Sequence, residues 1–324
     1  IKHPEDIHIV GHRVVHGGER LKQTTVISPA VKEEIKRLFT LAPLHNPGNY
    51  QGILVAEALF ENAIHVAVFD TAFHQTIPQK AFRYAIPRQY YEKHGVRVYG
   101  FHGISHQYVA AEASKYLQQW DAKIITIHLG NGCSMAAVSS GTSLDTSMGL
   151  TPLDGLIMGT RCGSIDPSVI FHLISELGLS AQEAEELLNK GSGMLGLTGS
   201  SDMRDIRQLT DSNDHNAILA CEMYAYRIKK FIGAYAAAMN GLDAIAFTAG
   251  VGENDPAMRE MVCRDMDFLG IHLDNVANCS PGTSLRQISS AFSRVRVLVV
   301  PTKEELQIAE ECQKLVSQSA RQSC

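Results

Sequence analysis

A chain of 324 residues, 45% of them hydrophobic and 19% charged, has the composition of an ordinary globular protein and is long enough for two domains. Its net charge of −5 at pH 7 argues against nucleic acid or an anionic membrane surface as the main partner. The 7 cysteines are scattered and never stand in C-x-x-C spacing, which favours reduced thiols in the cytoplasm over a disulfide framework.

Apolar runs with strand character alternate with helical patterns along the chain, and this alternation predicts an α/β fold. The predicted strands are residues 7–16, 63–70, 123–130, 134–140, 243–250 and 295–301. These runs repeatedly end in glycine, aspartate or histidine. Because ligands bind at strand ends in open α/β sheets, we expect the functional residues at these positions.

Two helix starts between these strands carry a predicted buried stripe. Ser105 is expected to cap the first helix, and its buried stripe is Val109, Ala113, Tyr116 and Leu117. Asp166 and Pro167 are the expected N-cap and first residue of the second helix. The buried stripe of that helix is Val169, Ile170, Leu173 and Leu177.

Further helix boundaries follow from capping patterns. Ser180 and Glu183 match the capping box, in which each residue bonds the backbone of the other. A long helix is expected over residues 215–240, with Gly241 in the usual place after a helix end. Its most apolar part, residues 231–239, is too short to span a bilayer.

Acidic residues at two strand ends are candidate ligands of a divalent cation. Asp70 closes the strand in "VFDTAFHQT", where it forms an Asx turn or helix cap, or binds Mg²⁺ at a phosphoryl-transfer site. In "PTKEEL", Glu305 is explained as the capping-box partner of Thr302. Glu304 remains unexplained, which makes it the better metal candidate.

Two glycine-containing segments follow predicted strands. "HLGNGCS", residues 128–134, leaves one strand through a Gly-x-Gly turn and returns into the next. "FTAGVGEN", residues 247–254, is expected to form a strand, a Gly-x-Gly turn and a helix N-terminus. Such turns can bind phosphate through backbone N–H groups, but a single glycine turn after a strand is more often just a tight connection. Their joint presence favours phosphate binding.

One further tract, residues 145–167, has many glycines and fits neither helix nor strand periodicity. Arg161 is its only cation, beside the carboxylates Asp145 and Asp154. A guanidinium in such a tract suits an anionic ligand, since it pairs bidentately with carboxylate or phosphate oxygens.

The histidines raise the alternative of a zinc hydrolase. His12 and His16, and likewise His102 and His106, are separated by four positions, but no H-E-x-x-H motif is present. A structural histidine, or a donor to anions, is therefore the favoured interpretation of each.

Taken together, the motifs "GHRVVHGGE", "FDTAFHQTIP", "YGFHGISH", "HLGNGCS", "DTSMGLTPLDGLIMGTRCGSIDP", "FTAGVGEN" and "PTKEE" resemble those of the acetate kinase family, in the same order. The resemblance implies an actin-like ATPase fold of two related domains. It also implies reversible, ATP-dependent phosphorylation of acetate to acetyl phosphate, with Mg²⁺ or Mn²⁺ as cofactor. The implied partners are acetate and ATP or ADP, with a homodimer as the assembly and neither nucleic acid nor membrane as a partner.

The resemblance also assigns expected roles residue by residue. The catalytic residues are Arg13, Asp70, His102 and Arg161. The acetate pocket contains Arg13, Val15, Leu44, His45, Phe101 and Pro152. The nucleotide contacts are His128, Gly130, Asn131, Gly132, Asp202, Met203, Arg204, Gly250, Val251, Gly252 and Asn254. The metal ligands are Glu304 and Asp70.

One motif of the family, a strand followed by an Asn-x-Gly-Ser-Ser-Ser phosphate loop, is not found in this sequence. We therefore expect the natural protein to extend before Ile1, and a chain that starts there to be nearly inactive and prone to aggregate when expressed alone. The expected domains are residues 1–72 with 305–324, and residues 73–304. Propionate or butyrate kinase activity, and a catalytically impaired nucleotide-binding protein of the actin-like fold, remain as alternatives.

Overall fold

The computed structural model describes residues 3–43 and 45–322, with side chains up to residue 318. This part of the chain forms two compact units. The first comprises the described residues up to Tyr108, residues 142–144 and those from Thr302 onward; the second comprises residues 109–141 and 145–301. The expected domain division after residues 72 and 304 stays a prediction.

The first unit is built around a sheet with strand order β1–β3–β2. Its elements are the 3₁₀ helix η1 (Pro4–Asp6), β1 (Ile9–Val14), β2 (Thr25–Val26), α1 (Pro29–Arg37), η2 (Leu38–Thr40), α2 (Asn46–Leu59), β3 (Ile64–Phe69), η3 (Phe73–Thr76), α3 (Gln79–Phe82), α4 (Gln89–His94) and α14 (Glu304–Gln322). Helix α5 (Gly103–Leu117) and strand β6 (Thr142–Thr146) have residues in both units.

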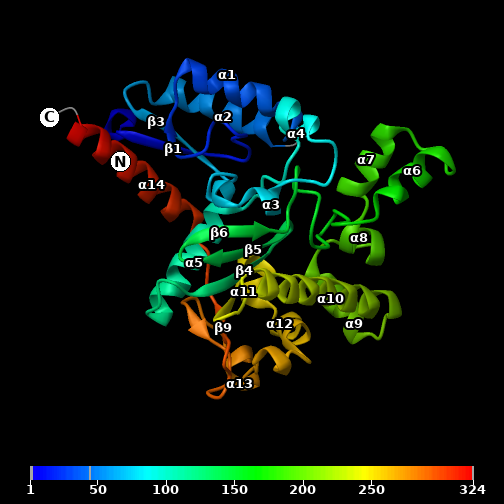
Figure 1. Cartoon of the computed structure of the whole chain (residues 1–324). Helices are drawn as coiled ribbons and strands as arrows, with labels where there is room; N and C mark the ends of the chain where they lie inside the picture. Colours follow the sequence, from blue (N-terminus) through cyan, green and yellow to red (C-terminus); the bar gives the residue numbers. More distant parts are fainter. Residues whose placement is uncertain (1–2, 44, 323–324) are drawn as a thin grey trace. The chain divides into compact units, whose positions relative to one another are not determined.

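Both faces of this sheet are covered, as Figure 1 shows with α1 and α2 on one side of β1 and β3 and α14 on the other. Ala67 and Phe69 of β3 lie in one apolar cluster with side chains of α1 and α2. Val66 and Val68, which point the opposite way, pack with Cys312 of α14. The sheet is thus fixed from both sides, and so are its strand ends.

Strands β1 and β3 are parallel and in register, with Val14 opposite Phe69. Their carboxyl ends therefore lie at the same edge of the sheet, and the N–H of Asp70 donates to the Val14 carbonyl at 3.0 Å. The side chains of Arg13 and Asp70 are brought together by this register.

The second unit is built around a larger sheet with strand order β6–β5–β4–β7–β9–β8. Its remaining elements are β4 (Lys123–Leu129), β5 (Cys133–Ser139), α6 (Pro167–Ser175), α7 (Ala181–Lys190), α8 (Gly193–Thr198), α9 (Met203–Asp211), α10 (His215–Ala238), β7 (Ala244–Thr248), α11 (Ala249–Asn254), α12 (Pro256–Cys263), η4 (Asp267–Leu269), α13 (Asn275–Cys279), β8 (Arg286–Gln287) and β9 (Arg296–Val299).

In this sheet β4 and β7 are parallel, as are β7 and β9, whereas β5 is antiparallel to β4. All residues of β7 are buried, and the long helix α10 packs against β4 and β5 (Figure 1). The segments that follow β4 and β7, residues 130–132 and 249–254, begin at one edge of the sheet.

The structure confirms the predicted strand runs, each of which overlaps one of β1, β3, β4, β5, β7 and β9. It also confirms Asp166 as an N-cap, whose carboxylate accepts the Ser168 N–H at 2.9 Å, and the capping box of Ser180 and Glu183. The predicted long helix is α10, and Gly241 after it has the positive φ of 133° that favours glycine.

Two helix predictions are wrong in part. Helix α5 begins at Gly103, so Ser105 lies inside it rather than capping it, because the chain already turns at His102, where φ is +54°. On the same helix Tyr116 is 47% exposed rather than buried.

The stripe predicted to be buried on α6 is also wrong, since no residue of this helix is fully buried. Helix α6 packs against α7, and Val169 is 43% exposed. The apolar spacing correctly located a helix, but spacing alone does not predict which other element covers the apolar face of that helix.

Across residues 3–43 and 45–322, no helix has both the length and the apolar composition needed to cross a membrane.

Candidate active site

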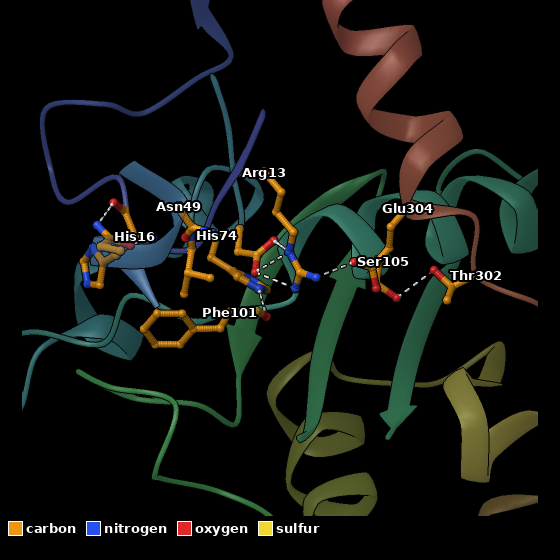
Figure 2. Close-up of polar contacts among 11 residues, drawn as sticks. Arg13, His16, Asn49, His74, Phe101, Ser105, Thr302 and Glu304 are labelled. Atoms are coloured by element: carbon orange, nitrogen blue, oxygen red, sulfur yellow. Dashed lines mark hydrogen bonds and ion pairs between the residues drawn. The ribbon is translucent and has the colours of Figure 1, made fainter. Parts of the chain in front are cut away.

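Arg13 lies between two carboxylates at the end of the β1–β3 pair. Its Nη2 donates to Oδ2 of Asp70 at 2.8 Å, and its Nε lies 3.1 Å and 3.2 Å from the two carboxylate oxygens of Asp70. Its Nη1 forms an ion pair with Oε2 of Glu304 at 3.0 Å. Figure 2 shows Arg13 extended toward Glu304 at the start of α14. The guanidinium of Arg13 thus joins the carboxylates of Asp70 and Glu304, which are far apart in the sequence.

The charges of this cluster do not balance. Asp70 is 1% exposed, and burial raises its pKa although Arg13 opposes the shift. Burial raises the pKa of Glu304 as well, with a further contribution from Asp70. Burial lowers the pKa of Arg13, but its carboxylate neighbours outweigh this and hold the pKa above its usual value. Two carboxylates therefore share one cation, which leaves a place for additional positive charge.

These two carboxylates are oxygen donors of the kind that Mg²⁺ and Mn²⁺ prefer, so the donor set fits a divalent cation. Within the described ranges, no group of three or more His, Cys, Asp or Glu side chains could hold a metal. A Mg²⁺ ion that takes its other ligands from phosphate and water needs only one or two carboxylates.

A hydrogen bond between two hydroxyls fixes the chain just before Glu304. Oγ of Ser105, in the first turn of α5, lies 3.0 Å from Oγ1 of Thr302 (Figure 2). Helix α14 begins at Glu304, two residues after Thr302. The capping box proposed for Thr302 and Glu305 stays a prediction.

The loop after β1 is held by amide side chains. The N–H of Val15 donates to Oδ1 of Asn49 at 3.1 Å, and that of His16 to Oδ1 of Asn46 at 3.0 Å. Asn46 returns a bond from its Nδ2 to the His16 carbonyl at 3.0 Å. The His16 ring lies edge-on to Phe101, with centroids 5.5 Å apart. Val15 and Phe101 are therefore fixed, buried apolar side chains of the first unit.

The other residues predicted for the acetate pocket have different positions. His45 directly precedes α2 and is half-buried. Pro152 belongs to the second unit and is half-buried. Leu44 lies outside the described residues. His102 is half-buried in the turn between Phe101 and α5.

Arg161 lies in the second unit and, unlike Arg13, has no carboxylate among the described residues to neutralise its charge. Its Nη1 donates to the Pro152 carbonyl at 3.1 Å and contacts Sδ of Met158 at 3.7 Å. No ion pair of Arg161 is present in the described part of the chain. Burial lowers the pKa of this guanidinium. A half-buried cation without a counter-ion is a suitable place for an anionic ligand.

The glycines around Arg161 have a packing role. Gly155 and Gly163 have positive φ values of 101° and 70°. A Cβ on Gly155 would lie 2.5 Å from the Ser147 carbonyl oxygen, and one on Gly163 would lie 2.3 Å from that of Leu156. The close backbone approach that these glycines permit is therefore to the chain itself.

A cavity of about 1000 Å³ lies within the second unit. Predicted nucleotide contacts that line it are Gly130, Asn131, Asp202, Met203, Arg204, Gly250, Val251 and Asn254. The other three predicted contacts, His128, Gly132 and Gly252, are not among its lining residues. This volume is at the upper end of the range for small-molecule sites.

The predicted Gly-x-Gly turn after β7 is wrong. Helix α11 begins at Ala249, directly after β7, so Gly250 and Gly252 lie inside the helix. The turn is made by Ala249 itself, with φ at +64°, and its N–H is capped by Oε1 of Glu253 at 2.9 Å. Gly250 has open space where a Cβ would stand, so this helix still presents bare backbone to the cavity.

Sequence reasoning missed several residues that line the cavity or hold its wall. Arg207 forms two 2.9 Å bonds with Asp255, whose carboxylate also caps α12. Tyr224 lines the cavity from α10, and its hydroxyl lies 3.0 Å from Sγ of Cys133. The position of Arg207, three residues after Arg204 on one helix, was a usable signal; Tyr224 gave none.

Comparison with known proteins extends this description. A model of the acetokinase family matches residues 1–310. The acetate kinase of Flavobacterium johnsoniae is 55% identical over 316 residues, which cover 98% of this chain and 80% of that protein. The crystal structure of the Porphyromonas gingivalis acetate kinase matches with a TM-score of 0.93 and 48% identity, over 98% of this chain and 80% of that one.

A second solved structure, a propionate kinase from Francisella tularensis subsp. tularensis, matches with a TM-score of 0.92 and 46% identity, over 96% of this chain and 80% of that one. The fold is thus the actin-like ATPase fold of these structures, as the sequence predicts.

Proposed function

This chain belongs to the acetokinase family, and we propose that it transfers the γ-phosphoryl group of ATP to acetate, reversibly, to give acetyl phosphate and ADP. The observation that carries the proposal is the cluster of Arg13, Asp70 and Glu304, in which two carboxylates share one guanidinium at the carboxyl end of two parallel strands. Such a cluster attracts a divalent cation and holds an anionic substrate beside it.

In this reaction a carboxylate oxygen of acetate forms a bond to the γ-phosphorus. The bond from that phosphorus to the bridging oxygen breaks, and ADP leaves with the electron pair. Little covalent chemistry is required of the protein, so its contribution is positioning and charge neutralisation.

We assign the charge-stabilising roles to arginines and a histidine. Arg13 pairs with the acetate carboxylate and the transferring phosphoryl group, which its planar donors suit. Arg161 is the second guanidinium for that group, and its lack of a carboxylate partner supports this role. His102 donates to the phosphoryl oxygens during transfer. Asp70 orients Arg13 through its paired hydrogen bonds.

Asp70 and Glu304 are also the residues that hold Mg²⁺ or Mn²⁺ in this proposal. When bound, the cation neutralises charge on the ATP phosphates. The shared guanidinium supports this assignment, because Arg13 compensates one negative charge of the pair and leaves one uncompensated.

The acyl group is proposed to contact Val15, Leu44, His45, Phe101 and Pro152. The rigid backbone at Val15 and the complete burial of Phe101 support a small pocket, which favours acetate. The match to a propionate kinase at 46% identity keeps propionate as the second candidate acid.

ATP or ADP is proposed to bind in the cavity of the second unit. The predicted contacts that line it support this, together with the bare backbone at Gly250. His128, Gly132 and Gly252 are assigned to the same nucleotide site from the resemblance alone. Cytoplasmic location and a homodimeric assembly are further parts of the proposal, and sedimentation of the intact protein tests the dimer.

The proposal is tested by incubating the intact protein with ATP, Mg²⁺ and acetate, and trapping acyl phosphate as the hydroxamate. We expect product that depends on all three components. Arg13→Ala should slow its formation, and Arg20→Ala is the matched control, because Arg20 is an exposed arginine paired with Glu34 on the same unit. If nucleotide binds but neither acetate nor propionate is phosphorylated, the chain is a nucleotide-binding protein without kinase activity and the proposal fails.

A further inference from the structure

His74 is a completely buried histidine to which the proposed reaction assigns no role. It lies in η3, four residues after Asp70. Its Nε2 lies 3.1 Å from the Phe101 carbonyl oxygen and its Nδ1 lies 2.8 Å from Oγ of Ser143. Figure 2 shows the His74 ring beside Phe101, with the bond from His74 to the Phe101 carbonyl drawn as a dashed line. Both ring nitrogens are thus engaged.

These contacts fix the tautomer of His74. Burial lowers its pKa to about 4, so the ring is neutral at physiological pH. A carbonyl oxygen can only accept, so Nε2 carries the proton and donates it to Phe101. Nδ1 then accepts the proton of the Ser143 hydroxyl. Ser143 is itself fixed, because its carbonyl accepts a 2.8 Å bond from Oγ1 of Thr76.

The carbonyl that His74 holds belongs to the residue just before His102. His102 has a φ of +54°, a left-handed conformation that is uncommon for a residue with a side chain. On its other side, the N–H of Gly103 donates to the Asp70 carbonyl at 2.9 Å. A Cβ on Gly103 would lie 2.1 Å from that oxygen, so the turn is pressed against the end of β3.

The turn is therefore held on both sides of His102, and the His102 carbonyl itself accepts the N–H of His106 at 2.9 Å. On the Gly103 side, the hydrogen bond joins two main-chain groups, so replacement of a side chain leaves it in place. On the Phe101 side, the only described hydrogen bond to the carbonyl comes from the side chain of His74. A strained φ persists only where the surroundings determine it, and loss of the Phe101 bond removes the restraint on the amino-terminal side of the turn, so that the His102 ring can shift.

We propose that His74 is a positioning residue for phosphoryl transfer, which aims His102 at the transferring group by holding the Phe101 carbonyl. This inference rests on the proposed function for the role of His102. The neutral His74 ring takes no part in proton transfer. Its contribution is geometric, and a misplacement of about 1 Å at such a centre costs about 10²-fold in rate.

The test compares two amides at position 74. In His74→Gln the side-chain N–H reaches as far as Nε2 and keeps the bond to the Phe101 carbonyl; in His74→Asn it is one methylene too short. We expect His74→Asn to lower kcat by about 10- to 100-fold and His74→Gln to keep most of it. The KM for ATP should stay within about twofold in both, because the nucleotide cavity is lined by the second unit only.

Equal kcat values in the two variants, whether high or low, would overturn the inference, since they would show that the bond to Phe101 is not what matters. A parallel rise in the KM for ATP in His74→Asn would also overturn it, because it indicates general loss of structure. Ser143→Ala is the matched control. It removes the partner of Nδ1 but leaves the Phe101 bond, so its kcat should resemble that of His74→Gln.

A measurement without turnover separates this inference from the proposed function. The imidazole signals of His102, identified by their loss in His102→Gln, are recorded by NMR in each variant. They should stay in place in His74→Gln and shift or broaden in His74→Asn. Unchanged His102 signals in His74→Asn contradict the inference even in a protein that proves to have no kinase activity. Absence of acyl phosphate from the wild-type protein would instead remove the proposed function alone.

Discussion

The two units differ in how they balance the charge of their candidate arginines. In the first unit, Arg13 forms ion pairs with two carboxylates, and the neighbouring loop is tied down by amide side chains. In the second, Arg161 contacts a carbonyl and a thioether and has no counter-ion among the described residues. In the first arrangement the charge of the arginine is already neutralised before ligand arrives and one carboxylate charge is left over, whereas the second leaves a cation for the ligand to neutralise.

This difference separates two ways of preparing a site. Internal ion pairs fix the geometry of Arg13 but reduce the charge it offers. An unpaired guanidinium such as Arg161 costs free energy in the empty protein and interacts more strongly with an incoming anion. The variants below are expected to separate these contributions.

The largest effect is expected from Arg161→Ala. Loss of a charge stabiliser at a phosphoryl centre should lower turnover by about 10³-fold or more. The fold should be retained, because Arg161 has no ion pair to lose in the described structure. Steady-state assay of acyl phosphate formation measures the effect. Arg264→Ala is the control, since that arginine is exposed and its ion pair among the described residues is with Glu260 of the preceding helix α12. Near-normal turnover in folded Arg161→Ala would exclude this residue from the active site.

The acyl pocket should discriminate more weakly. Acetate is expected to be the best substrate, followed by propionate and then butyrate, because an added methylene gains about 0.8 kcal/mol of burial but overfills a rigid pocket. Values of kcat/KM should differ by about 10- to 200-fold for one carbon. Val15→Ala should shift the preference toward propionate. A butyrate optimum in the wild-type protein would contradict the assignment of acetate.

The two arginine substitutions should rank differently in stability and in turnover. Arg13→Ala should destabilise the protein more than Arg161→Ala, whereas Arg161→Ala should lower turnover more. Arg13→Ala removes the partner of the buried Asp70 carboxylate and should lower the free energy of unfolding by about 1–3 kcal/mol. Arg161→Ala should change it by less than about 0.5 kcal/mol. Urea unfolding of both variants checks this, with Arg20→Ala as the exposed control. Equal destabilisation by the two substitutions would mean that the contrast between the units is not real.

A smaller, pH-dependent effect is expected from His74. Burial lowers its pKa from 6.5 to about 4, so the unfolded chain binds a proton at mildly acid pH that the folded chain does not. Stability is therefore complete above pH 6.5 and is lost as pH falls toward 4, by about 2 kcal/mol at pH 5. His74→Gln should flatten this part of the curve of unfolding free energy against pH. An unchanged slope would show that His74 is not the group that titrates.

Local sequence signals predicted much of the fold. Strand runs, the Asp166 cap and the end of α10 depend on residues that are close in the sequence, and these predictions are confirmed. Failures occurred where the sequence does not show which residue turns the chain or which element covers an apolar face. The Gly-x-Gly segment after β7 became part of a helix because Ala249 makes the turn and Glu253 caps it. The apolar stripe of α6 says nothing about which partner covers it.

The candidate site shows the same limit. The resemblance singled out Arg13, Asp70 and Glu304, and the structure brings these three together. The sharing of one guanidinium by two carboxylates could not be predicted, because it depends on where α14 packs against the sheet. Supporting residues such as His74 and Asn49 were also missed, since a buried polar side chain is recognised only by the backbone group it bonds.

The proposed phosphoryl transfer is tested most directly by phosphorus NMR of the intact protein mixed with Mg²⁺, ATP and acetate. The γ-phosphate signal of ATP should be replaced by those of acetyl phosphate and ADP in equal amounts, and Arg161→Ala should suppress this exchange without unfolding the protein. Release of inorganic phosphate at the same rate with and without acetate, and no acyl phosphate signal, would contradict it.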